Sequence, residues 1–161
     1  MAFDMLMKVS NGIEGESKIS GHEKQIDVLA WSWGGSQSGS FHLGGGGGSG
    51  KANVQDLSFT HYVDTATPKL QLACFNGEHL DEVTLKMRKA GKDPQDYLIV
   101  KMEKVLISSF STGGSGGEDR LTENVTFNFA KVKVTYMVQD DKGTTVAGPE
   151  YEYDIEANKS K

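Results

Sequence analysis

The chain has 161 residues and a mass of 17.5 kDa, with 37% hydrophobic residues, 24% charged residues and a single cysteine. That length is too short for two ordinary domains, so residues 1–161 are expected to form one domain with a conventional hydrophobic core. The lone Cys74 excludes an internal disulfide framework, and the formal charge of −5 argues against nucleic acid as the main partner.

Alternating hydrophobic and polar residues predict the first two strands at Phe3 to Val9 and at Ile26 to Trp33. The second strand is expected to place Leu29, Trp31 and Trp33 on one face and Val28, Ala30 and Ser32 on the other. The two tryptophans then share a face, which favours core or interface packing over a platform that stacks sugars or bases.

A third strand is predicted from Leu57 to Val63, and one short helix follows it. Thr67 is expected to cap this helix, Pro68 suits its first turn, and Gly77 can end it. Beyond the helix, the pattern predicts a hairpin whose strands lie on either side of a turn around Pro94.

The last part of the chain also predicts strands. Between Val125 and Val138 the hydrophobic phase slips by one residue near Ala130 or Lys131, which indicates a bulge or a sharp bend. A turn at residues 139–144 precedes a closing strand, which carries Tyr151, Tyr153 and Ile155. Seven or so strands with one helix predict a mainly β fold, a barrel or a sandwich.

Glycine makes up 20 of the 161 residues, and 13 of these 20 lie in two windows, Gly34 to Gly50 and Gly113 to Gly117. We interpret the windows as long glycine-rich loops of one domain. The segment GGGGSGKA, from Gly45 to Ala52, nearly matches a phosphate-binding loop. Ala52 lacks the hydroxyl that would bind magnesium, and the following residues alternate like a strand, so a flexible loop is favoured over a nucleotide site.

The other candidates for catalysis are weak, and we expect no enzyme activity, no cofactor and no metal. The histidines have no metal-ligand spacing, and they are His22, His42, His61 and His79. Cys74 has no neighbour in the sequence that would activate it as a nucleophile. The paired acids adjoin turns or loops, where solvated charge is expected, and they are Asp81 with Glu82, Glu118 with Asp119, and Asp140 with Asp141.

No membrane insertion is expected, because no stretch approaches the ~20 apolar residues of a spanning helix. The first residues carry Asp4 where a secretory signal has basic residues. Any export is therefore expected to use a route without a cleaved signal peptide.

A resemblance to a known family is carried by two long segments, IDVLAWSWGGSQSGSFHLGGGGGSGKANVQDLSFTHYVD (Ile26 to Asp64) and SSFSTGGSGGEDRLTENVTFNFAKVKVTY (Ser108 to Tyr136). They resemble the haemolysin-coregulated protein (Hcp) family of type VI secretion systems. The opening MAFDMLMKV and the segment TPKLQLAC resemble the same family. The resemblance extends to about Val138 and is loose beyond Asp140.

The resemblance implies an antiparallel β-barrel with one short flanking α-helix. It also implies hexameric rings that stack into the inner tube of a contractile, phage-tail-like injection machine. The implied partners are further copies of the chain, the sheath and spike of the machine, and small effector proteins carried inside the ring. The protein would be cytoplasmic before export and then secreted.

Two sets of site residues follow from the implied assembly. Ala30 and Ser32, opposite the two tryptophans, are candidates for the channel wall, because the family's sheet lines the channel and its helix lies outside. A glycine-rich arm from Gly34 to Lys51 would reach up to roughly 55–60 Å if fully extended, far enough to contact the next ring. Phe41 and Leu43 would anchor this arm, whose full candidate set is Phe41, His42, Leu43, Gly44, Gly45, Gly46, Gly47, Gly48 and Lys51.

Two other functions stay open at this point. One is a soluble monomeric β-barrel that binds a small ligand in its interior, and assembly into rings would separate it from the tube subunit. The other is a nucleotide enzyme built on Gly45 to Lys51, which Lys51-dependent phosphate release would reveal.

Overall fold

The computed structural model describes residues 3–39 and 52–161. Within these ranges the chain forms strands and one helix, and the predicted mainly β class is confirmed. The elements are β1 (Phe3–Val9), β2 (Ile26–Ser32), β3 (Gly35–Gln37), β4 (Ala52–Val54), β5 (Leu57–Tyr62), α1 (Thr67–Asn76), β6 (His79–Lys89), β7 (Gln95–Gly113), β8 (Thr122–Gln139), β9 (Thr145–Asp154) and β10 (Lys159–Ser160).

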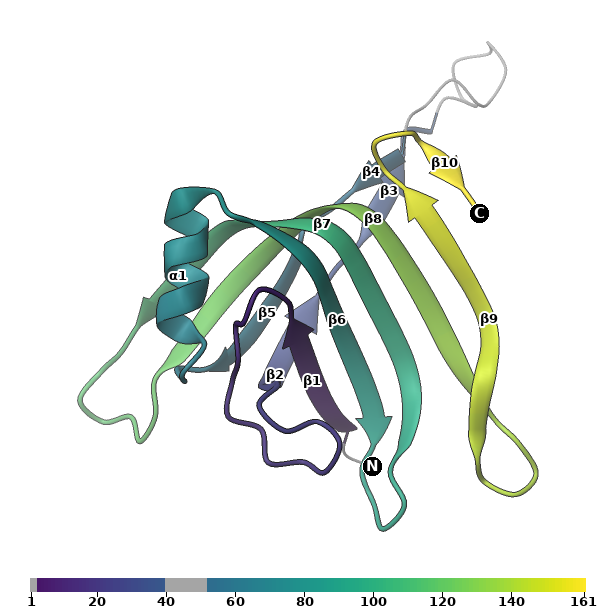
Figure 1. Cartoon of the computed structure of the whole chain (residues 1–161), viewed down its shortest axis with the longest axis horizontal. Helices are drawn as coiled ribbons and strands as arrows, with labels where there is room; N and C mark the ends of the chain where they lie inside the picture. Colours follow the sequence, from purple (N-terminus) through teal and green to yellow (C-terminus); the bar gives the residue numbers. More distant parts are fainter. Residues whose placement is uncertain (1–2, 40–51) are drawn as a thin grey trace.

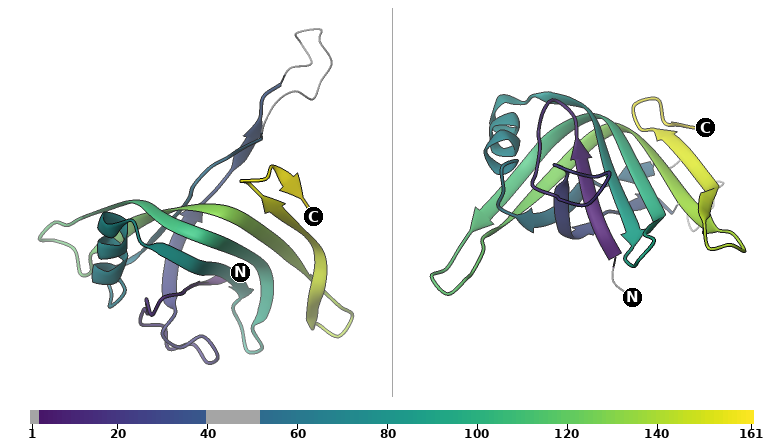
Figure 2. Two further views of the ribbon diagram at one scale, coloured as in Figure 1. Left: turned by 45° about the horizontal axis from the view of Figure 1, so that its top comes forward. Right: turned by 60° about the horizontal axis from the view of Figure 1, so that its bottom comes forward.

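The strands form a closed antiparallel barrel with an extension on one side (Figure 1). The barrel order is β8-β5-β2-β1-β6-β7, and the pairing of β7 with β8 closes it. Strands β9 and β10 continue outward from β8 and are not part of the closed ring of strands. The short strands β3 and β4 form a separate hairpin that leads away from the barrel (Figure 2).

The prediction that the last strand closes the barrel is wrong, and the length of β8 explains why. One edge of β8 pairs with β5 along Thr122 to Phe127 and then with β9 from Lys131 onward. The opposite edge pairs with β7 along almost its full length. Because β7 already closes the barrel, β9 can only extend the sheet beyond it.

The predicted phase slip in β8 is confirmed, and it is a bend rather than a bulge in the pairing with β7. Phe129 and Val132 are both buried, although they are three positions apart and a regular strand would place them on opposite faces. The partner strand slips at the same level, where Lys104 has a φ of 53°. The pairing register stays constant through this level, so both strands bend together and pass from one side of the barrel to the other.

The predicted faces of β2 are wrong in the first half of the strand and right in the second. A register shift against β5 lies between Val28 and Ala30, so that Val28 is buried while Leu29 is 41% exposed. Beyond this bulge Trp31 and Trp33 pack against the core. A bulge adds one residue to a strand and reverses which side chains face inward, which alternation alone does not show.

The helix has the predicted extent but not the predicted cap. Ala66 is the N-cap residue, and Thr67 is already helical and accepts a hydrogen bond from the Asp64 N–H at 3.1 Å. The Asp64 carboxylate in turn accepts the Ala66 N–H at 2.8 Å, so a turn before the helix replaces the side-chain cap. Gly77 ends the helix with a φ of 64°, a conformation that favours glycine.

The hydrophobic core fills the barrel interior. Phe59 of β5 and Phe127 of β8 are stacked with ring centroids 5.3 Å apart, and both side chains are almost fully buried. Leu70 and Ala73 attach the inner face of α1 to the barrel wall. Other fully buried core side chains come from every barrel strand and include Met7, Ile26, Leu85, Met102 and Ile107.

Candidate functional site

The outer face of four strands carries two rows of small uncharged side chains, all polar except Ala30, called here the polar rows. The strands lie in the order β2, β5, β8, β7, and register pairs define each row. The first row is Ser32, Ser58, Thr126 and Ser109, and the second row is Ala30, Thr60, Asn124 and Ser111. Since their sequence neighbours Phe59, Val125 and Phe127 are buried, the rows point away from the core.

Hydrogen bonds between strands tie the polar rows together. The hydroxyls of Ser58 and Thr126 are 3.1 Å apart, and the Thr60 hydroxyl donates to the Asn124 side-chain carbonyl. At the border of the rows, Asp56 accepts hydrogen bonds from Ser108 at 2.7 Å and from Asn128 at 2.8 Å. The rows themselves contain no charged residue. This face is therefore hydrophilic, but it has no charged group that could form an ion pair with a partner.

Both edges of this four-stranded region are open in the described part of the chain. Strand β1 pairs with β2 only at Ile26 and Asp27, which leaves β2 from Val28 onward without a partner on that side. Strand β6 reaches β7 only up to Leu106, so the segment of β7 from Ile107 to Gly113 has a second open edge. An open backbone edge can pair with another strand.

Ala30 and Ser32 are the two members of the polar rows that the sequence pattern indicated, and the other six were not predicted. Ala30 and Ser32 lie on the rows, both exposed, at the β2 end. The other members come from β5, β7 and β8, and only the strand register brings them beside β2. Their signal was present in the alternation of small polar with buried residues in LSFTHY and in ENVTFNF.

The predicted arm residues, from Phe41 to Gly48 and Lys51, lie outside the described residues. The base of the hairpin that precedes and follows them is well defined. Trp33 Nε1 donates to the Gln55 carbonyl oxygen at 2.8 Å, and the Gln55 N–H donates to the Gly34 carbonyl oxygen at 2.9 Å. The chain therefore leaves the barrel through a fixed exit.

A buried polar network connects α1 to the barrel beneath it. His61 of β5 and Glu123 of β8 are both fully buried, and His61 Nε2 donates to Glu123 Oε1 at 2.8 Å. Gln71 of α1 donates to the other oxygen of Glu123 at 2.8 Å. His61 Nδ1 lies 3.5 Å from Asp64 Oδ2, close enough for an ion pair.

Charge sets the protonation state of His61. Burial by itself lowers the pKa of the imidazole, but the carboxylates of Asp64 and Glu123 outweigh it and raise this pKa from 6.5 to about 9. His61 is therefore an imidazolium at neutral pH. The network is a charged clamp between helix and barrel. The sequence pattern does not reveal it, because His61 and Glu123 are 62 positions apart in the chain.

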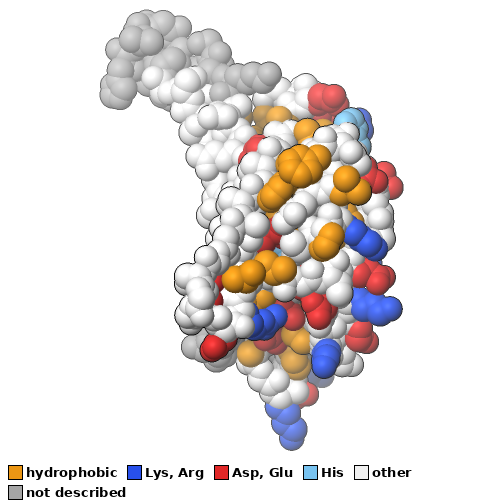
Figure 3. Space-filling model, turned by 90° about the vertical axis from the view of Figure 1, so that its left-hand side faces the viewer, with side chains coloured by type: hydrophobic (Ala, Val, Ile, Leu, Met, Phe, Trp, Pro, Cys, Tyr) orange, Lys and Arg blue, Asp and Glu red, His pale blue; other side chains and the backbone are white. Residues whose placement is uncertain are grey.

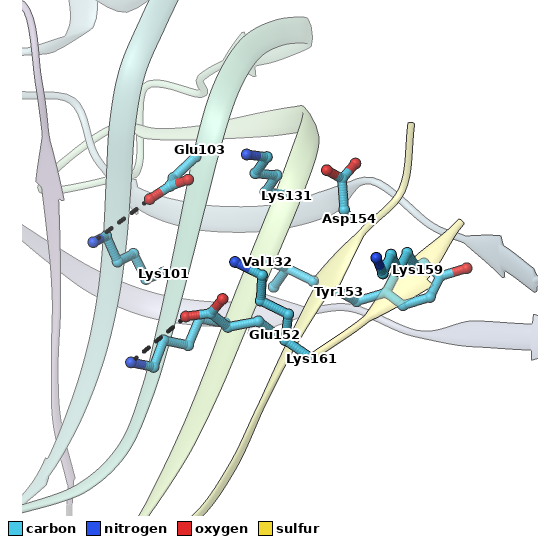
Figure 4. A pocket seen from close by; sticks show the side chains of 10 residues that line it. Lys101, Glu103, Lys131, Val132, Glu152, Tyr153, Asp154, Lys159 and Lys161 are labelled. Atoms are coloured by element: carbon cyan, nitrogen blue, oxygen red, sulfur yellow. Dashed lines mark ion pairs between the residues drawn. The ribbon is translucent and has the colours of Figure 1, made fainter. Parts of the chain in front are cut away.

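A cleft of about 300 Å³ lies between the outer parts of β7, β8, β9 and β10 (Figure 4). Lys101 Nζ lies 3.6 Å from Glu103 of the same strand, and Lys133 Nζ of β8 lies 3.9 Å from Glu152 of the neighbouring strand β9. These ion pairs are partly exposed and therefore contribute little to stability. Lysines outnumber acids in its lining, and two of the lysines are held in these ion pairs, so the cleft is a basic surface groove.

The remaining sequence candidates do not assemble into a reactive site. The paired acids at 81–82, 118–119 and 140–141 are all exposed. Across residues 3–39 and 52–161, no three metal-binding side chains converge. No helix in the described ranges has the length and hydrophobicity to cross a membrane.

Comparisons with known proteins agree on one family. The family described as "Type VI secretion system effector, Hcp" matches residues 6–136. Protein hcp1 of Pseudomonas aeruginosa is 57% identical over 160 residues, which cover 98% of this chain and 98% of that protein. A solved structure of a type six secretion system protein is 30% identical, covers 99% of this chain and 100% of its own, and has a TM-score of 0.91. Hcp1 from Salmonella typhimurium is 36% identical with full coverage of both chains and a TM-score of 0.81.

Proposed function

The chain belongs to the Hcp family of type VI secretion proteins, and we propose that it is the subunit of hexameric rings that stack into the inner tube. The observation that carries this proposal is the four-stranded region with uncharged polar rows and two open edges. Neighbouring copies placed edge to edge would continue the polar rows around a closed channel. A ring of this kind uses unlike edges of successive subunits, as a head-to-tail contact requires.

The strand directions support this arrangement. Each strand of the region is antiparallel to the next along the order β2, β5, β8, β7. The open edge of β7 therefore runs opposite in direction to β2 of the same chain. A neighbour related by rotation about the ring axis would thus present β2 to β7 as one more antiparallel pair.

The character of the polar rows suits transport of a folded passenger. Serine, threonine and asparagine side chains are short, and their hydrogen bonds run largely within the wall. A passenger would meet weak and replaceable contacts, which permit both retention and release. The passengers proposed are small effector proteins of the same secretion system.

The proposed contact between successive rings is the glycine-rich arm. Its described base, the hairpin of β3 and β4, projects well beyond the barrel (Figure 2). Phe41 and Leu43 remain the proposed anchors on the next ring. The sheath would surround this tube and the spike would cap it.

The alternative of a ligand-binding monomer has less support. The barrel interior is occupied by fully buried side chains such as Met7, Phe59, Met102 and Phe127, which leave it packed rather than hollow. A nucleotide enzyme has no observation in its favour in the described residues.

Electron microscopy of the purified full-length protein tests the proposal. We expect negatively stained particles in the form of rings with a central hole. A field of particles without rings, at the concentrations at which the protein is monodisperse, would contradict the tube subunit and favour the monomeric barrel.

A charge on the polar rows tests the channel wall. Ser32→Arg should leave the ring intact but lower retention of a co-expressed effector of the same system about tenfold, because confining an unpaired charge against a passenger costs about 1.4 kcal/mol. Ser20→Arg, in the loop between β1 and β2, adds the same charge away from the rows and is the matched control. Equal retention by both variants would remove Ser32 from the channel wall.

A further inference from the structure

Large hydrophobic side chains that remain exposed in the described residues gather in two groups. One group, the helix patch, consists of Val63, Leu72, Phe75 and Leu121 beside α1. The other group, the arm patch, consists of Tyr136, Val138, Val146 and Tyr151 on β8 and β9. Phe3 joins the arm patch through Tyr97, whose ring packs against both Phe3 and Tyr136, and Leu29 stands alone at the β2 bulge.

The arm patch continues the core face of β8 past the end of the barrel. Alternate side chains along this face become more exposed, from Val132 at 3% to Tyr136 at 43%. Val138 of β8 pairs with Val146 of β9, and Val134 pairs with Tyr151, so these side chains share the face. The face loses its cover because β5 pairs with β8 only as far as Phe127.

The helix patch lies at the other end of the molecule. Leu72 and Phe75 point outward from α1 and are 58% and 77% exposed. Phe75 packs edge-on against Phe110 of β7, with ring centroids 5.3 Å apart. The Val63 N–H donates to the Leu121 carbonyl oxygen at 2.9 Å and so places those two residues on adjoining chain segments. Figure 3 shows several hydrophobic side chains on this side of the molecule, with charged side chains along its right-hand border and among the lower hydrophobic ones.

The two patches are placed for contact between copies. With the longest axis of the molecule horizontal, α1 lies near one end and β9 at the other (Figure 1). The helix patch also adjoins, through Phe110, the part of β7 whose open edge the proposed ring assigns to a neighbour. Unlike patches at opposite ends form a head-to-tail contact that repeats around a ring, whereas a twofold dimer would need a patch that matches itself.

We propose that the arm patch of each subunit docks on the helix patch of the next copy of the same chain, and that this contact closes the ring. The inference rests on the proposed function, because a ring must form for its contact to be assigned. Both patches combine aromatic with aliphatic side chains and lack charge at their centres, as the buried centres of subunit interfaces do. Within one subunit the arm patch on β8 and β9 stays exposed, and this contact would bury it.

A mixing experiment with two full-length variants tests the docking. Val138→Asp with Val146→Asp disables the arm patch, and Leu72→Asp with Phe75→Asp disables the helix patch. Each variant alone should shift in light scattering from six times to one times 17.5 kDa, with unchanged far-ultraviolet circular dichroism. An equimolar mixture should form a heterodimer of twice that mass, because one intact arm patch then meets one intact helix patch.

The controls separate this inference from the proposed function. Ser20→Asp paired with Lys18→Asn matches the added negative charge on an exposed loop and should stay hexameric. A hexameric parent with hexameric patch variants would overturn the docking but keep the ring, whereas a monomeric parent would overturn the ring itself. Folded monomeric variants that fail to form the heterodimer, or a helix-patch variant that dimerises alone, would also overturn the head-to-tail docking.

Discussion

Replacement of Phe127 by alanine should lower the free energy of unfolding by about 3–5 kcal/mol. The side chain is fully buried and stacks on Phe59 at 5.3 Å, so its removal loses both hydrophobic transfer energy and packing contacts. It also joins the two sheet regions at the place where β8 pairs with β5 and β7 at once.

Urea denaturation at one fixed protein concentration measures this effect, since assembly otherwise adds a concentration-dependent contribution to stability. Leu29→Ala is the control, because this large side chain at the β2 bulge is 41% exposed and its truncation should cost less than about 1 kcal/mol. Equal losses for the two variants would show that the interior between Phe59 and Phe127 is not the stabilising core of the fold.

Stability should also fall as the pH rises toward and through 9, because of His61. Its pKa is raised from 6.5 to about 9 in the folded state, so the folded protein holds this proton more tightly than the unfolded chain. The resulting stabilisation is fully present below about pH 6.5 and is lost as the pH rises through about 9. A difference of this size corresponds to about 2–3 kcal/mol once screening of the pair by its surroundings is allowed for.

Urea titrations of the parent and of His61→Gln across this pH range measure the contribution. The variant should show a much flatter pH dependence, although it is less stable at neutral pH because Glu123 then keeps its buried charge without a counter-ion. Glu123→Gln removes that charge and should recover part of the loss when combined with His61→Gln. An equally steep decline in the parent and in the double variant would assign the pH dependence to other groups.

The sequence predicted the strands well because alternation is a local property. Each strand from β1 to β8 with a clear period of two was located, and the helix was located by Pro68 and Gly77. The errors arose where one extra residue or one distant partner decides the outcome. The bulge at Leu29 reversed part of β2, and the cap expected from Thr67 was replaced by the turn at Asp64.

The site was only partly predictable for the same physical reason. Ala30 and Ser32 could be proposed from the sequence because they alternate with tryptophans within one strand. Their continuation through Thr126 and Ser109 depends on register across three pairings that span most of the chain. The charged clamp at His61 likewise required two strands and a helix to be placed side by side.

The fold and the proposed assembly explain each other. β7 and β8 are long enough to bend and to form part of two sides of the barrel. This leaves the polar rows with open strand edges, and an uncovered extension of β8 and β9 beyond the barrel. A solitary subunit would expose all of these surfaces to solvent. A ring would cover the edges and the patches while leaving the polar rows free to face a passenger.

The mass of the purified protein in solution tests this account most directly. Light scattering coupled to size-exclusion chromatography should give six times 17.5 kDa for the unmodified chain at micromolar concentration. A mass of 17.5 kDa under the same conditions would contradict the ring, and with it the proposed channel wall and the docking of the arm patch on the helix patch.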